Sequence, residues 1–157
     1  MKTKSYVIVC LSIIFIGNVF AQQKRTTQDI LMSYYWITPP APEGEENLID
    51  RVWYYDKINE YFFASKSRLW GHEEYVRAGR KPVQSPYYLS DHFEQKFDST
   101  RLGQQTDGKY IIRVGFRGAR VFEIMELNEE KLVLRAISES GEPSKTNITT
   151  WLARPRE

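Results

Sequence analysis

The residue types that most often carry acid–base or metal chemistry are scarce in this chain. Its only histidines are His72 and His92. The acidic residues close to them in the sequence are Glu73, Glu74, Asp91 and Glu94. Such residues would form a zinc site or a hydrolytic acid–base pair only if they converged in one pocket. Because adjacent residues of a strand point to opposite faces, Asp91 cannot simply orient His92, and we expect both histidines to be solvated loop residues.

A second candidate, Gly103 to Lys109, has the two-glycine and lysine spacing of a phosphate-binding loop. Its context does not fit, because Tyr110 follows where a magnesium-binding Ser or Thr is needed, and a strand follows in place of a helix. The adjacent glutamates are Glu45 and Glu46, Glu73 and Glu74, and Glu129 and Glu130. Glycoside hydrolysis needs two carboxyls from separate elements, which consecutive residues do not provide. We therefore expect no catalytic residue, no metal ligand and no cofactor.

The amino terminus predicts export. Met1 to Ala21 begins with Lys2 and Lys4, continues with an apolar stretch over Val7 to Val19, and ends in a small-residue cleavage site. The apolar stretch is short for a bilayer span, so we expect no stable membrane span after cleavage. The only cysteine, Cys10, lies in this segment, so the mature chain would have neither disulfides nor a thiolate nucleophile. The expected location is the periplasm or the cell surface.

The charge balance argues against nucleic acid as a partner. The chain has 22 Lys and Arg against 20 Asp and Glu, and two of the lysines belong to the export signal, which leaves a formally neutral domain. Basic and aromatic residues do alternate from Lys66 to Trp70, as they would on an oligonucleotide or polysaccharide platform. An anionic glycan, a lipid head group, an acidic protein or ordinary surface charge all remain open for this segment.

Alternating apolar segments predict strands along most of the remaining chain. The expected strands cover residues 29–37, 51–56, 60–65, 86–90, 109–114, 120–127, 131–138 and 147–153. Several connections are short, so neighbours in sequence should be neighbours in the sheet. Eight strands are also the number at which an up-and-down barrel closes around side chains or one small ligand. The prediction is an all-β antiparallel meander, with a signal peptide over 1–21, a flexible leader over 22–28 and one barrel domain over 29–157.

Several segments make the chain similar to a known family. They are Tyr87 to Asp91 (YYLSD), Phe97 to Gly103 (FDSTRLG), Asp107 to Ile112 (DGKYII) and Glu123 to Leu127 (EIMEL), together with an early Trp36. These turn and core signatures resemble those of the small exported lipocalin-like barrels of Bacteroidetes. The resemblance implies a lipocalin-like barrel of about eight strands with an open end, and it brings no shared catalytic motif.

An aromatic hairpin supplies the candidate ligand-binding residues. The runs 51–56 and 60–65 place Trp53, Tyr55, Tyr61 and Phe63 as inward-facing candidates, and Trp70 follows in a loop expected at the barrel mouth. We therefore predict an exported non-catalytic binding module that holds a small hydrophobic or amphipathic ligand in or at the mouth of the barrel. The alternative is a protein-interaction or inhibitor module of the cell envelope that uses residues 66–85. A hydrolase using His72 or His92 with a carboxylate is the third hypothesis.

Overall fold

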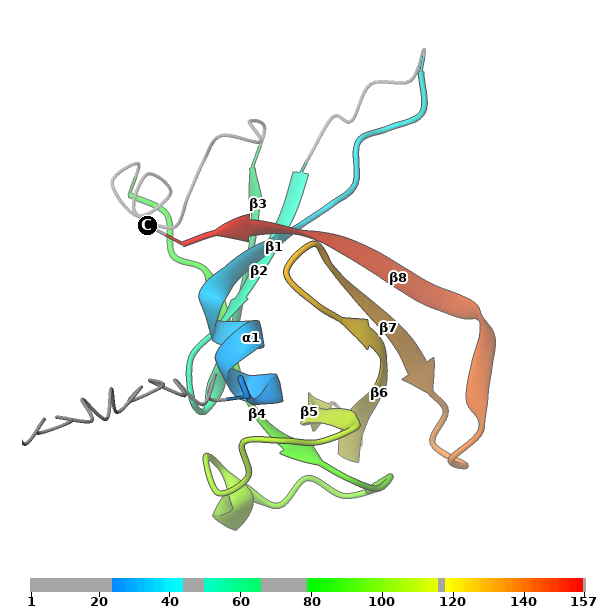
Figure 1. Cartoon of the computed structure of the whole chain (residues 1–157). Helices are drawn as coiled ribbons and strands as arrows, with labels where there is room; N and C mark the ends of the chain where they lie inside the picture. Colours follow the sequence, from blue (N-terminus) through cyan, green and yellow to red (C-terminus); the bar gives the residue numbers. More distant parts are fainter. Residues whose placement is uncertain (1–23, 44–49, 66–78, 116–117, 157) are drawn as a thin grey trace, which may run out of the picture.

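The computed structural model describes residues 24–43, 50–65, 79–115 and 118–156. In these ranges the strands are β1 (Tyr34–Ile37), β2 (Asp50–Tyr55), β3 (Asn59–Ser65), β4 (Val83–Ser90), β5 (Tyr110–Gly115), β6 (Gly118–Leu127), β7 (Lys131–Ile137) and β8 (Pro143–Pro155). Each strand pairs antiparallel with the next, and β1 pairs with β8, which closes the sheet into a barrel (Figure 1). The prediction of an all-β antiparallel meander closing into an eight-strand barrel is confirmed.

The side chains that face the interior of the barrel are mainly large and apolar. The buried ones are Leu31, Trp36, Tyr55, Tyr87, Leu89, Ile111, Leu132, Leu134 and Trp151. They come from alternate positions of the strands because side chains along a strand point to opposite faces. At β5 and β6, for example, Ile111 pairs with Phe122, and both belong to this interior cluster. Burial of this surface is the main favourable contribution to the stability of the barrel.

The first predicted strand is wrong in its first half. Residues 29–33 belong to a helix, α1 (Thr27–Ser33), and only Tyr34–Ile37 form a strand. The helix begins at a capping box, in which the Thr26 hydroxyl accepts from the Asp29 amide at 3.1 Å and the Asp29 carboxylate accepts from the Thr26 amide at 3.0 Å. These bonds satisfy amides that would otherwise lack partners at the helix start, so they favour a helix despite the apolar composition.

The helix α1 closes one end of the barrel. It contacts β2 and β6, which lie on separate parts of the wall, and Leu31 is fully buried in the interior cluster (Figure 1). The segment predicted as a flexible leader ends inside this helix, because Thr27 and Gln28 belong to it. Gln28 is buried, and its side-chain amide donates to the carbonyl of Lys57 at 2.8 Å.

The connection between β4 and β5 crosses the outer face of the barrel. It contains a short 3-10 helix, η1 (Ser99–Arg101), and the side chains of Phe93, Phe97 and Leu102 pack on a second apolar cluster. That cluster is formed by the outward-facing residues Tyr88, Ile112 and Val121 of three neighbouring strands. This part of the wall is therefore covered on both sides.

Candidate functional site

A cavity of about 720 Å³ extends from the interior of the barrel to the outward-facing residues Val121 and Ile137. The residues that line it include Arg51, Trp53, Tyr55, Arg113, Arg120, Phe122, Leu132, Leu134, Ala136, Ser138, Glu139, Asn147, Thr149 and Trp151. They come from β2, β5, β6, β7 and β8 and from the turn after β7. The volume lies within the range of about 300–1,000 Å³ that is typical of small-molecule sites.

One part of the cavity wall is aromatic and aliphatic. The rings of Trp53 and Trp151 meet edge to face with centroids 4.3 Å apart, and Trp53 also packs against Phe62 at 4.4 Å. Leu132 and Leu134 are buried beside them. Such rings present a large apolar area with little conformational freedom, so this part of the cavity suits an apolar group.

The cavity wall becomes polar toward the end opposite α1. Arg51 near the start of β2, Arg120 near the start of β6 and Ser138 after β7 line the cavity and are exposed to solvent. On β8, Asn147 and Thr149 are also exposed cavity residues. The cavity thus has an apolar interior and a polar, solvent-accessible mouth.

The structure separates the four predicted hairpin residues into two pairs. Trp53 and Tyr55 line the cavity, as the sequence predicts. The inward orientation is wrong for Tyr61 and Phe63, which pack with Val52 and other residues in a cluster apart from the interior one. The fifth candidate, Trp70, lies outside the described residues, as do His72 and residues 66–78 of the predicted interaction loop.

The register of the hairpin explains this separation. Trp53 pairs with Phe62 and Tyr54 pairs with Tyr61, so odd-numbered residues of β2 share a face with even-numbered residues of β3. The turn sets this register, because the Asp56 carboxylate accepts from the amides of Ile58 at 2.8 Å and Asn59 at 2.7 Å. A register shifted by one residue moves every side chain to the other face, and the aromatic residues on both faces hid the correct choice.

A buried ion pair lies next to the aromatic wall. Arg113 Nη1 donates to Glu60 Oε1 at 2.7 Å, and their side chains are 16% and 7% exposed. The Arg113 guanidinium also lies over the Phe122 ring, 4.2 Å from its centroid. Two buried atoms of this pair, Glu60 Oε2 and Arg113 Nε, have no hydrogen-bond partner among the residues that the structure describes. Burial raises the pKa of Glu60, although the charge and hydrogen bond of Arg113 oppose that shift.

Sequence reasoning missed the arginines of the cavity. Arg113 and Arg120 pair directly across β5 and β6, so their side chains leave the same face of the hairpin, and both line the cavity. Two like charges directly opposite each other in a sheet are destabilising. The short spacing between the two arginines, with Gly115 and Gly118 between them in the sequence, is the signal by which this pair could have been found.

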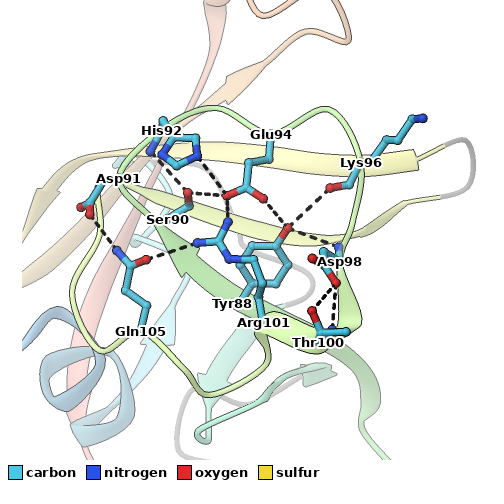
Figure 2. A network of polar contacts seen from close by, with 10 residues as sticks. All are labelled: Tyr88, Ser90, Asp91, His92, Glu94, Lys96, Asp98, Thr100, Arg101 and Gln105. Carbon is cyan, nitrogen blue, oxygen red and sulfur yellow. Dashed lines mark hydrogen bonds and ion pairs between the residues drawn. The ribbon is translucent and has the colours of Figure 1, made fainter.

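The second predicted centre, around His92, forms a different arrangement (Figure 2). Glu94 accepts from Ser90 Oγ at 2.5 Å, from Tyr88 Oη at 2.9 Å and from Arg101 Nη1. His92 Nε2 lies 3.8 Å from the same carboxylate, and its side chain is 73% exposed. The Ser90 hydroxyl donates its proton to Glu94 and not to the His92 ring, so the two residues do not form a serine–histidine pair in this arrangement.

The hydrogen bonds to Glu94 hold this carboxylate in its charged form. Burial acts to raise the pKa of Glu94, but bonds from Ser90, Arg101 and Tyr88 outweigh it and keep the pKa below the usual value. Burial and the bond to Glu94 raise the pKa of Tyr88 to about 12. The network of hydrogen bonds to Glu94 therefore attaches the loop after β4 to the barrel.

Within the described ranges, no group of three or more His, Cys, Asp or Glu side chains has a geometry that could hold a metal ion.

Comparison with protein-family models, with curated proteins and with solved structures finds no match for this chain. A search of the described residues for a helix long and apolar enough to cross a membrane also finds none.

Proposed function

We propose that the protein is an exported, lipocalin-like binding module that holds a small amphipathic ligand in the barrel cavity. The observation that carries this proposal is the cavity of about 720 Å³, with Trp53 and Trp151 on its apolar wall and arginines toward its mouth. A cavity with an apolar lining and a few placed polar groups is typical of small-molecule sites. The export signal predicted over Met1 to Ala21 supports the periplasm or cell surface as part of the proposal.

The test is native mass spectrometry of the protein purified gently from an envelope extract without added ligand. We expect a discrete retained mass on the wild-type protein and its loss from Trp53→Ala, which removes an aromatic cavity wall. Leu134→Trp is a second variant that should also lose the retained mass, because the larger side chain occupies the cavity without removing the aromatic wall.

Tyr61→Ala is the matched control for Trp53→Ala. It removes a ring of similar size from the outer face of the same hairpin, where Tyr61 stacks on Tyr54 with centroids 4.6 Å apart. The control should keep the retained mass. Loss of the mass from Tyr61→Ala but not from Trp53→Ala would place the ligand outside the cavity. A wild-type protein without bound ligand that instead co-purifies with a protein partner would favour the interaction module.

A further inference from the structure

We infer that the ligand is an anionic amphiphile, whose negatively charged head is bound by Arg113 and Arg120 and whose apolar part packs against Trp53 and Trp151. This inference rests on the proposed function and adds the chemical class of the ligand. It starts from the charges that line the cavity, since arginine is the side chain best suited to bind carboxylate or phosphate oxygens.

Positive charge exceeds negative charge around the cavity. Arg51, Arg113 and Arg120 line it, whereas Glu139 at the mouth is the only acidic lining residue among those described. Glu60 offsets the charge of Arg113 through their ion pair. Neither Arg51 nor Arg120 forms an ion pair with any acidic side chain of the described part of the chain. The remaining charge favours an anion at this end of the cavity.

The pairing of two arginines across one hairpin supports the same conclusion. Arg113 and Arg120 are direct cross-strand neighbours on the cavity face, an arrangement that is destabilising unless an anion lies between or beside the two charges. Glu60 contacts only Arg113 at ion-pair distance. An anionic head group in the cavity would reduce the repulsion between the two arginines further than Glu60 does.

Two contacts position the Arg113 guanidinium on the cavity wall. Glu60 Oε1 accepts from Arg113 Nη1 at 2.7 Å, and the guanidinium lies over the Phe122 ring, 4.2 Å from its centroid. The charge of Arg113 is therefore held beside the cavity before a ligand arrives.

The apolar side of the cavity indicates the chemical nature of the uncharged part of the ligand. This side of the cavity carries no charged group, so it suits an alkyl chain or a ring system. Its residues are Trp53, Trp151, Leu132 and Leu134. A free inorganic anion would leave this surface without contacts, whereas a neutral lipid would leave the arginines without a partner. The combination favours one molecule with an anionic head and an apolar chain.

The inference is tested by calorimetric titration of the full-length protein with four probes of equal chain length, each below its micelle concentration. The probes are dodecanoate, dodecyl phosphate, dodecanol and dodecylammonium. We expect one or both anionic probes to bind at least about tenfold more tightly than dodecanol, the effect of one charge-assisted contact. The tighter of the two anions identifies the head group as carboxylate or phosphate.

Three variants locate the head group. Arg120→Gln should reduce anion affinity about tenfold and leave dodecanol affinity unchanged, whereas Glu60→Gln should increase anion affinity because a nearby negative charge is removed. Lys131→Gln is the matched control: it removes the same charge at the end of the barrel near α1, where Lys131 pairs with Glu126 at 2.9 Å. This control should leave all four affinities unchanged.

Two outcomes would overturn the inference in distinguishable ways. If dodecanol or dodecylammonium binds as tightly as the anions, or if Arg120→Gln weakens all probes equally, the cavity binds ligands without selecting anions and the proposed function stands. If no probe binds, both the inference and the proposed function fail.

Discussion

Two glutamate–arginine pairs lie on opposite sides of the barrel wall, and their surroundings differ. On the outer side, Glu94 accepts from Ser90, Tyr88 and Arg101, and neither of its oxygens lacks a partner (Figure 2). On the inner side, the pair of Glu60 and Arg113 leaves one acceptor and one donor unpartnered.

The difference separates the Glu94 network, which stabilises the fold, from the Glu60–Arg113 pair, which we propose lies beside a bound ligand. A complete network stabilises the part of the fold that it joins, and here it joins the loop after β4 to the barrel. An incomplete one costs stability, because its buried polar atoms lose their bonds to water without gaining a partner. The pKa directions agree, since the bonds to Glu94 lower its pKa whereas burial raises the pKa of Glu60.

Removal of the outer carboxylate should have the largest effect on stability. Glu94→Ala leaves Arg101 and the hydroxyls of Ser90 and Tyr88 without their shared acceptor, and we expect a loss of about 3 kcal/mol in the free energy of unfolding. Denaturant titration measures this loss. Asp91→Asn is the control, because Asp91 is exposed and bonds only Gln105 among the described side chains. A loss below about 0.5 kcal/mol in Glu94→Ala would show that the network is not structural.

Replacement of the inner pair should change stability far less. In the double variant Glu60→Leu with Arg113→Met, apolar side chains of similar length replace both charges, and the methionine still packs on Phe122. We expect the free energy of unfolding to stay within about 1 kcal/mol of the wild type. Affinity for the anionic probe should nevertheless fall about tenfold. Destabilisation as large as that of Glu94→Ala would contradict the distinction between the two pairs.

The smallest effect should appear in the acid dependence of stability, and the two glutamates should act in opposite directions. The folded pKa of Glu94 is below the ordinary 4.5, so its contribution is present above that value and is lost as the pH falls through the folded pKa. The folded pKa of Glu60 is above 4.5, so its contribution is present below that value and is lost as the pH rises through the folded pKa.

Two single variants measure this opposition. Between about pH 3 and 6, Glu94→Gln should make the loss of stability on acidification shallower, and Glu60→Gln should make it steeper. The measurement is the free energy of unfolding from denaturant titrations at several pH values. Equal slopes in the two variants would remove the proposed electrostatic difference between the inner and outer pairs.

The strand pattern and the barrel could be predicted from the sequence because both depend on local features. The alternation of apolar and polar residues indicates the strands around Ile111 and Leu134, and short connections favour pairing between sequential strands. The inward orientation of Trp53 and Tyr55 could be predicted in the same way, and both line the cavity. Tyr61 and Phe63 were assigned to the wrong face, because the hydrogen bonds of Asp56 in the turn decide the register.

The period of apolar residues therefore determined the eight-strand antiparallel meander, since each strand carries its own apolar face. Only the tertiary structure decided what lies inside the barrel. Glu60 and Arg113 are 53 residues apart, and no local pattern shows that they meet. Closure of the sheet brings β3 and β5 to the same interior, and the hairpin register turns Arg113 and Arg120 toward the cavity. The charge of the site depends on contacts between distant strands, which exist only after the barrel has closed.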